Sequence, residues 1–396
     1  MLPDVASWRI LLGTIFGRDY WTPTQPRYAW RDDSYQGGAI SRSPAAVWKP
    51  PLLVRRMKIL LLQLKRIGDL ILTTPAIAAL RKNYPDAHIT LAISNECAEL
   101  LPAISNVDHV LITRRNLRDL GMVSSVAGKR FDYCIDFTRN DRSAFLTLLS
   151  GARKRVASYR VRDQSKTRAR VYTDLVGVRV RDMHTIDYNL ALLEPLDVHP
   201  ASSAPQLDLP RTAREKADRL RRDWKIRRPY VILHPGSARR EKLWNAARWA
   251  EVIEHFGENN ESDLVLTSGL SVDEQTHVAE ITKRTRQRFV NLSGKTDLLA
   301  LAALIGQAQL LVTVDSAPVH FAACTHTPQV ILFGPTNPFH WRPTHSPALI
   351  LHGKSDGPVT EFAPVRPRFP MSEISTEAVI SAMDSLLPRR AAVHSS

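Results

Sequence analysis

The chain has few cysteines and no long apolar segment, and both absences narrow what it can be. Only 3 of its 396 residues are cysteine, and Cys97, Cys134 and Cys324 lack the close spacing of metal ligands. The pattern predicts buried free thiols and a reducing compartment. No run approaches the roughly 20 apolar residues of a membrane-spanning helix. The apolar stretch 8–16 lacks the basic start and cleavage site of a signal peptide.

Several catalytic motifs are also missing. There is no Gly-x-Ser-x-Gly elbow and no Walker lysine, and no Gly-x-Gly-x-x-Gly follows the first expected strand of either half. These absences argue against a serine hydrolase, a P-loop nucleotidase and a simple dinucleotide enzyme. No helix-turn-helix, zinc finger or aromatic stacking signature points to nucleic acid as a partner. We expect no cofactor and no metal.

The composition is nevertheless that of a folded, basic protein. Its 44% apolar content can fill real cores, its length favours two domains, and its formal charge of +15 favours acidic partners. Residues 1–56 show no steady periodicity, whereas a buried strand begins abruptly at Met57. We interpret the first 56 residues as a loosely ordered extension or an over-long gene model, which mass spectrometry of the native N-terminus would test.

From Met57 onward, apolar strands alternate with amphipathic helices, which is typical of parallel sheets covered on both faces. Residues 197–210 are rich in Pro, Ser and Ala and predict a linker. The expected fold is therefore α/β, with two doubly wound Rossmann-like domains facing a central cleft. We place the first domain at 57–205, the second at 206–388 with a last helix able to pack back on the first, and a tail at 389–396. The expected strands are 58–63, 88–93, 109–113, 133–137, 155–158, 230–234, 264–267, 289–292, 310–314 and 330–333, and the expected helices are 70–83, 117–127, 142–149, 211–228, 246–256, 272–284, 298–306, 319–324 and 376–387.

The turn after the first strand carries Lys65-Arg66-Ile67-Gly68-Asp69. Gly68 allows a ligand to approach the backbone closely. Asp69 stands near a helix N-terminus and has two interpretations of equal weight. It is either an N-cap or a general base that removes a proton from an acceptor hydroxyl.

The first strand of the second half ends in His234-Pro235-Gly236-Ser237, followed by a basic stretch that includes Lys242. Ser237 and the turn can cradle a phosphate, and Lys242 can neutralise a departing diphosphate. The alternatives are a solvated basic loop and, for His234, a packing residue at a strand end.

Two further strand ends carry acids. Asp273 and Glu274 open the helix after Thr267-Ser268-Gly269, where an acid accepts from ribose hydroxyls or only stabilises the helix dipole. Residues 313–320 read Thr-Val-Asp-Ser-Ala-Pro-Val-His, so Asp315 and Ser316 stand at a helix start with Pro318 in its first turn. Backbone N–H groups at a helix start bind anions. This arrangement suits a sugar nucleotide, and the chain therefore reads as an enzyme that handles an activated sugar.

Taken together, these motifs resemble glycosyltransferase family 9, the ADP-heptose:lipopolysaccharide heptosyltransferases. The matching pieces are Arg66-Ile67-Gly68-Asp69-Leu70 with Thr74-Pro75-Ala76, His234-Pro235-Gly236-Ser237 with Lys242 and Trp244, and 314–320 with Phe333-Gly334-Pro335-Thr336. The resemblance spans Met57 to about Pro388. The motif Asp-Ser-Ala-Pro-x-His at 315–320, with Phe-His-Trp-Arg-Pro at 339–343 downstream, is most similar to the branch that adds the lateral third heptose of the inner core.

The resemblance implies a GT-B fold, inverting chemistry and no required metal. By position, Asp69 resembles the catalytic base, Lys242 the diphosphate-binding lysine and Asp315 the acid that holds the heptose hydroxyls. The remaining donor residues by resemblance are Ser237, Asp273 or Glu274 for the ribose, and Ser316, Ala317 and His320 at the phosphate end. Some family members have Thr-Gly where this chain has Ser316-Ala317.

The sequence thus predicts transfer of heptose from ADP-L-glycero-D-manno-heptose to an inner-core heptose of lipopolysaccharide. Its partners would be a phosphorylated lipid A–core acceptor, met by Arg66, Arg139 and Arg142, and the anionic inner face of the inner membrane, where a cytoplasmic, peripheral enzyme would act. Two alternatives stay open: a heptosyltransferase for another acceptor, such as a capsule glycan or a protein, and a non-catalytic protein that binds sugar nucleotides.

Overall fold

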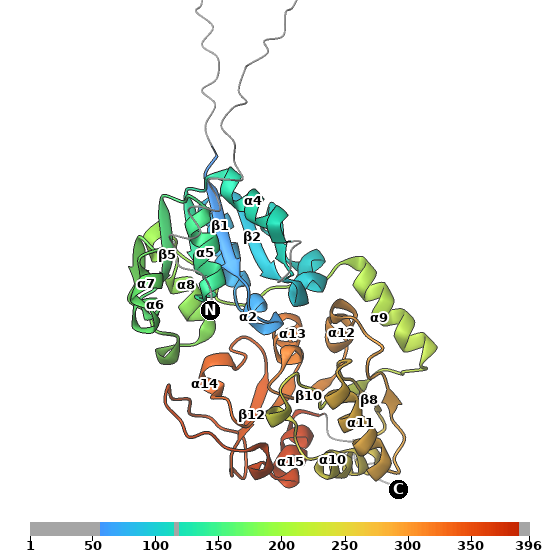
Figure 1. The fold of residues 1–396 in the computed structure, drawn as a ribbon. Coiled ribbons are helices and arrows are strands. Elements are labelled where there is room, and N and C mark those ends of the chain that lie inside the picture. Colours follow the sequence, from blue (N-terminus) through green and yellow to red (C-terminus); the bar gives the residue numbers. More distant parts are fainter. Residues whose placement is uncertain (1–55, 115–118, 388–396) are drawn as a thin grey trace, which may run out of the picture. The chain divides into compact units, whose positions relative to one another are not determined.

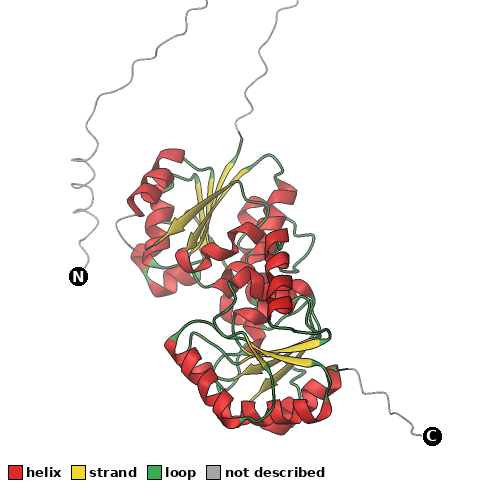
Figure 2. Ribbon diagram, turned by 90° about the vertical axis from the view of Figure 1, so that its right-hand side faces the viewer, coloured by secondary structure: helices red, strands yellow, loops and turns green. Residues whose placement is uncertain are grey.

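The computed structural model describes residues 56–114 and 119–387, and these residues build two parallel six-stranded sheets with helices on both faces (Figures 1 and 2). The first sheet has the strand order β3-β2-β1-β4-β5-β6, and the second has the order β12-β11-β10-β7-β8-β9. The α/β prediction is confirmed. The expectations for residues 1–55 and 389–396 lie outside the described residues, and the domain boundary at 205/206 stays a prediction.

The first sheet and its helices occupy residues 58–191. The strands are β1 (Lys58–Gln63), β2 (His88–Ser94), β3 (His109–Thr113), β4 (Tyr133–Asp136), β5 (Lys154–Ser158) and β6 (Asp174–Val176). The helices are α2 (Ile67–Ile71), α3 (Thr74–Asn83), α4 (Asp119–Lys129), α5 (Asp141–Leu149), α6 (Arg160–Gln164), α7 (Lys166–Ala169) and α8 (Thr185–Ala191).

The second sheet and its helices occupy residues 211–386. The strands are β7 (Tyr230–His234), β8 (Asp263–Leu266), β9 (Val290–Asn291), β10 (Leu310–Val314), β11 (Gln329–Phe333) and β12 (Ala348–His352). The helices are α9 (Arg211–Asp223), α10 (Ala246–Asn259), α11 (Val272–Arg284), α12 (Leu298–Ile305), α13 (Ala317–Thr325), α14 (Pro338–Trp341) and α15 (Thr376–Leu386).

The predicted helix over 70–83 is wrong, because two helices replace it. α2 ends at Ile71 and α3 begins at Thr74, with Pro75 in its first turn. Proline has no N–H to continue a helix through this point but is tolerated where a helix starts. The prediction also missed the edge strands β6, which has only three residues, and β12, which has five.

The apolar strands are buried on both sides. In β1, Ile59 and Leu61 pack in one hydrophobic cluster, whereas Leu60 and Leu62 pack in another with α4 and α5. The first cluster also contains Ile232 of β7, so side chains of the two sheets share one continuous apolar core. Among the described residues, no helix is long and apolar enough to cross a bilayer.

The strand orders determine where a ligand can bind. In each sheet the connections reverse direction between two central strands, β1 and β4 in the first sheet and β7 and β10 in the second. In open parallel sheets, ligands bind at the carboxyl ends of such neighbouring strands. The predicted motifs around Asp69, His234 and Asp315 follow β1, β7 and β10, so they lie at these two switch points.

Candidate active site

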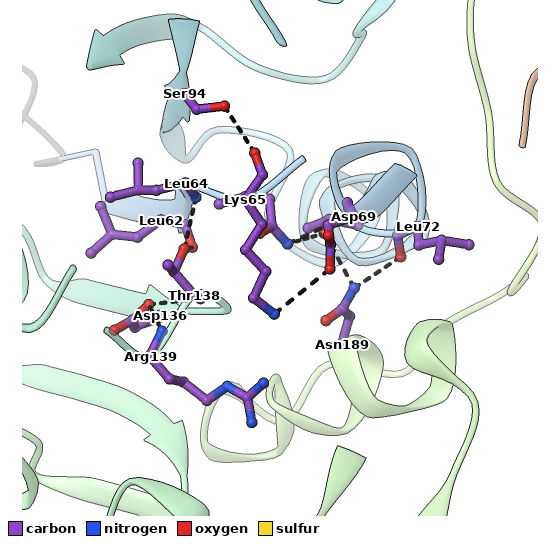
Figure 3. Close-up of polar contacts among 12 residues, drawn as sticks. Leu62, Leu64, Lys65, Asp69, Leu72, Ser94, Asp136, Thr138, Arg139 and Asn189 are labelled. Carbon is purple, nitrogen blue, oxygen red and sulfur yellow. Dashed lines mark hydrogen bonds and ion pairs between the residues drawn. The ribbon is translucent and has the colours of Figure 1, made fainter. Parts of the chain in front are cut away.

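Asp69 lies on the short helix α2, and two internal hydrogen bonds fix the turn of this helix. The Gln63 side chain donates to the hydroxyl of Thr73 at 2.7 Å, and that hydroxyl donates to the backbone oxygen of Asp69 at 2.7 Å. The N-cap of α2 is Arg66, and Asp69 is the acidic residue of the first turn. The N-cap interpretation of Asp69 is therefore wrong. Its carboxylate is 25% exposed and lies 3.7 Å from the ammonium of Lys65, which Figure 3 shows pointing toward it.

Gly68 brings this helix against α13. A Cβ atom at position 68 would lie 2.7 Å from Cδ2 of His320 and 2.8 Å from its Nε2. His320 belongs to the second half and lies beside its switch point. Asp69 of the first half therefore comes close to this switch point at His320. The sequence indicated close approach of a ligand at Gly68, and the structure adds a side chain from the opposite half.

We expect Gly68→Ala to lower the free energy of unfolding by about 1–3 kcal/mol, because the new methyl group overlaps a buried ring. The same shift of α2 would carry Asp69 away from α13 and reduce turnover. Chemical denaturation and initial rates measure both effects. The control is Gly121→Ala in α4, where nothing lies within 4 Å and alanine should stabilise by about 1 kcal/mol. Equal behaviour of the two variants would contradict the contact.

The second half places Lys242 and Asp315 in direct contact. The Lys242 ammonium donates to Oδ2 of Asp315 at 2.5 Å and to its backbone oxygen at 3.1 Å. Asp315 is buried, the Lys242 side chain is only 12% exposed, and the hydroxyl of Thr336 donates to the same Oδ2. Thr336 lies in a matched motif, but nothing in the sequence assigned it a partner 21 residues away.

This ion pair lies at the start of α13. Ser316 is the N-cap and its hydroxyl donates to the backbone oxygen of Val314, while Ala317 and Pro318 begin the helix. The free N–H groups and the positive end of the helix dipole favour an anion at this point. Lys242 therefore adds a full positive charge to a site that already suits a phosphate.

Ser237 lies in the turn after β7, and Glu274 packs against the same turn at Gly236. Ser237 is buried, and its hydroxyl accepts from the N–H of Arg239 at 3.2 Å. A Cβ atom at Gly236 would lie 2.5 Å from Oε1 of Glu274, so this carboxylate packs against the turn. Glu274 also accepts from Gly269 N–H at 3.2 Å. The acid that faces the phosphate-type turn is thus Glu274.

Asp273 points elsewhere. Neighbouring residues on a helix do not share a face. Asp273 is exposed and lines a cavity of about 370 Å³ together with Arg240, His277 and Arg284. The two acids, equivalent in the sequence, therefore differ in direction: Glu274 packs against the 234–237 turn, and Asp273 faces the cavity.

The three predicted acceptor arginines have different surroundings. Arg66 is exposed at the N-cap of α2. Arg142 pairs with Asp119 of α4. The guanidinium of Arg139 instead lies 4.8 Å from the centre of the Tyr188 ring. Burial lowers the pKa of the Lys65 ammonium, and the charge of Arg139 lowers it further, against the opposing effect of the Asp69 carboxylate.

Buried histidines surround the site in their neutral form. Burial lowers the pKa of His320 to about 4, against the opposing effect of the Asp315 and Asp69 carboxylates. Burial lowers the pKa of His234 to about 4 as well, and its Nδ1 lies 2.9 Å from Thr267 Oγ1. His234 is thus a hydrogen-bonded packing residue at a strand end, the alternative that the sequence left open. Burial also lowers the pKa of His184 to about 4.

His184 allows a pH test of this burial. Its Nδ1 accepts from Ile186 N–H and its Nε2 lies 2.9 Å from the backbone oxygen of Arg342. The folded-state pKa is below the unfolded value of about 6.5, so the unfolded chain binds the proton first. The stabilisation is complete above pH 6.5 and is lost as the pH falls toward 4. Between pH 6.5 and 5, urea denaturation should show a loss about 2 kcal/mol larger for the wild type than for His184→Gln. Parallel pH profiles would contradict the burial.

Comparison with known proteins agrees with this geometry. The lipopolysaccharide heptosyltransferase 3 of Escherichia coli K12 is 30% identical over 336 residues, which cover 82% of this chain and 96% of that protein. The crystal structure of a family 9 glycosyltransferase from Veillonella parvula matches with a TM-score of 0.71 and 25% identity, over 83% of this chain and 97% of that one. The E. coli heptosyltransferase WaaC with ADP-2-deoxy-2-fluoro heptose matches with a TM-score of 0.63 and 16% identity, over 84% and 100%.

The paired parallel sheets and these structural matches define a glycosyltransferase of the GT-B fold. The profile of glycosyltransferase family 9 (heptosyltransferase) matches residues 121–361, and the chain belongs to this family.

Proposed function

We propose that this enzyme transfers heptose from ADP-L-glycero-D-manno-heptose to a heptose of the lipopolysaccharide inner core, with inversion at the anomeric carbon. The heptosyltransferase 3 of E. coli, which shares 30% identity with this chain, supports the acceptor class. The heptosyltransferase WaaC, of the same fold, has been solved with an analogue of ADP-heptose, which supports the donor.

One observation carries the proposal. His320 of α13 packs against Gly68, the neighbour of Asp69 in the first half, and α13 begins just after Asp315, which pairs with Lys242 in the second half. A carboxylate suited to general-base catalysis therefore lies beside a cationic site suited to a diphosphate. A sugar bound between them would present its anomeric carbon to an acceptor hydroxyl held by Asp69.

The reaction then follows from the charges. Asp69 accepts the proton of the acceptor hydroxyl, the oxygen bonds to the anomeric carbon, and the bond to the diphosphate breaks to release ADP. Negative charge grows on the diphosphate, and Lys242 and the N-terminus of α13 stabilise it. Asp315 binds heptose hydroxyls, and Ser316, Ala317 and His320 line the phosphate end. On the donor side, we assign Ser237 to the phosphates. We assign the ribose to Glu274 or to its neighbour Asp273. On the acceptor side, we assign the acceptor glycan to Arg66, Arg139 and Arg142.

The test is a transfer assay with radiolabelled ADP-heptose, with and without isolated core acceptor. Label should move to the core glycan only when acceptor is present, and NMR of the product should show the inverted anomer. Transfer to a capsule glycan or a protein instead would contradict the acceptor. Donor binding without transfer to any acceptor would contradict the enzyme.

We also propose that the enzyme works at the cytoplasmic face of the inner membrane and docks there through α5, α6 and α7. Phe145 and Leu148 of α5 are 38% and 52% exposed, and they share a helix face with Asp141, which pairs with Arg168 of α7 at 2.7 Å. Exposed basic residues on the nearby elements add positive charge, which favours surfaces that meet anionic lipid. The exposed ones on β5, α6, α7 and their flanks are Arg153, Lys154, Arg162, Lys166 and Arg170.

Flotation with anionic and neutral vesicles tests the docking surface. Binding should require anionic lipid and weaken with salt. Leu148→Ser should weaken it by about 10-fold, because a leucine side chain no longer enters the interface. The control is Val365→Ser, which removes another exposed apolar side chain. No binding at low salt, or equal loss in both variants, would contradict the proposal.

A further inference from the structure

The helix that carries Asp69 cannot fix its own direction. α2 has only five residues, and helices this short are not stable through their backbone bonds alone. Pro75 has no N–H for the carbonyl of Ile71, four residues before it, and the hydroxyl of Thr74 donates there at 2.7 Å instead. The N–H of Thr73 bonds a carbonyl three residues back, so the carbonyl of Asp69 also lacks its helical donor. Side chains must therefore set the orientation of α2.

The hydroxyl of Thr73 is the centre of this arrangement. It donates to the backbone oxygen of Asp69 at 2.7 Å, and it accepts from Nε2 of Gln63 at 2.7 Å and from Nδ2 of Asn189 at 3.2 Å. A hydroxyl has one donor and two acceptor positions, so all three are used. Thr73 is 0% exposed, and water cannot replace any of these partners.

Asn189 adds a contact from a distant part of the chain, because it lies on α8, 116 residues after Thr73. Its Nδ2 also donates to the backbone oxygen of Leu72 at 3.0 Å, so one amide group holds two consecutive residues. Figure 3 shows the Asn189 side chain pointing from α8 toward the turn with Asp69 and Leu72. Gln63 is the last residue of β1, so the Thr73 hydroxyl ties α2 both to the central strand and to α8.

We propose that Thr73 and Asn189 are positioning residues for glycosyl transfer, which hold α2 in the orientation where the Asp69 carboxylate meets the acceptor hydroxyl. Both side chains are buried beneath the helix, and their bonds end on backbone oxygens and on each other. They therefore act through Asp69 and leave its carboxylate to the acceptor. The inference rests on the proposed function and adds to it the residues that keep the base in place.

Thr73→Val tests the role of the hydroxyl, because valine keeps the shape of threonine and removes its bonds. The kcat should fall about 10- to 100-fold, the cost of a catalytic group displaced by a fraction of its reach, while the KM values for donor and acceptor stay unchanged. Thr73→Ser keeps the hydroxyl and should retain a kcat close to that of the wild type. Initial rates at varied donor and acceptor measure these constants. Equal kcat for the valine and serine variants would overturn the proposal.

A double-mutant cycle shows whether the effect passes through Asp69. In the Asp69→Asn background, Thr73→Val should cause no further fall in kcat, because no base remains to be positioned. Asn189→Leu, which removes the amide at similar volume, should show the same dependence on Asp69. If either variant lowers kcat by the same factor in both backgrounds, its residue does not position the base and the proposal fails for it.

Thr147 of α5 provides a matched control. It is also 0% exposed, and its hydroxyl also donates to a carbonyl four residues back, that of Ser143, at 2.8 Å. Thr147→Val should therefore lower the urea midpoint as Thr73→Val does, but it should leave kcat unchanged. If both variants lower kcat equally, a general loss of stability explains the effect and the positioning role is refuted.

Native-state hydrogen exchange gives a readout that is independent of transfer. The N–H groups of Leu70 and Leu72 bond to Arg66 and Gly68 within α2, at 3.1 and 2.9 Å. Thr73→Val should speed their exchange about 10-fold, because local opening of α2 then breaks fewer bonds, and Thr147→Val should not. Equal exchange in wild type and Thr73→Val would contradict the proposal even if heptose transfer is observed. Absence of transfer to every acceptor would contradict the proposed function, and this exchange would then decide whether Thr73 holds α2.

Discussion

Asp69→Asn should lower kcat by about 10²–10⁴-fold, the usual contribution of a general base, while the affinity for ADP-heptose stays nearly unchanged. The amide is isosteric with the carboxylate but cannot take the proton of the acceptor hydroxyl. The fold should tolerate it, because the Asp69 carboxylate caps no helix and makes a partly exposed ion pair with Lys65. Single-turnover transfer rates and donor titration by calorimetry separate chemistry from binding.

Asp86→Asn is the matched control, since Asp86 is exposed in the turn after α3. It should leave kcat and donor affinity unaltered. Undiminished transfer by Asp69→Asn would refute the assignment of Asp69 as the base. If the variant lost only donor binding, Asp69 would be a donor-binding residue instead.

Lys242→Met should lower kcat by about 10²–10³-fold, as expected when a group that stabilises developing negative charge is removed. It should also weaken donor binding, because the diphosphate loses its cation. Unlike Asp69→Asn, this variant should lose about 3 kcal/mol of stability, since it leaves the buried carboxylate of Asp315 without its ion-pair partner. Transfer assays and urea denaturation measure the two effects separately.

The double variant Lys242→Met/Asp315→Asn distinguishes these effects. Removing both charges should recover most of the lost stability, because no buried charge remains unpaired. Turnover should remain low, since neither the cation at the diphosphate nor the acid at the sugar is restored. Recovery of turnover together with stability would show that Lys242 acts only on the fold.

Much of the fold could be read from the sequence because its signals are local. A strand buried on both faces is a continuous apolar run, and β1, β7 and β10 were predicted with their observed bounds. The helix predicted over 70–83 failed where Pro75 begins a second helix, although proline at a helix start is also a local signal. The edge strand β6 was missed because its three residues carry no clear periodicity, whereas β12 was missed although Ala-Leu-Ile-Leu-His is an apolar run as long as β7 or β10.

The candidate site was predictable to the level of its turns. Small and polar residues that follow apolar strands marked 64–69, 234–237 and 315–318, and parallel strands put their carboxyl ends at one edge. The direction of each side chain was not predictable. Asp273 and Glu274 are equivalent in sequence, yet one lines an outer cavity and the other packs against Gly236.

The amino-acid sequence alone determined the α/β class, the two halves and the motif order of family 9, because each depends on residues close together in the chain. Only the tertiary structure decided which groups meet: His320 against Gly68, Lys242 and Thr336 on Asp315, and Arg139 beside Lys65. Lys242 and Asp315 are 73 residues apart, and their contact depends on how strands pair across the sheet. Periodicity reports which face of an element is buried, but not which distant side chain it will contact.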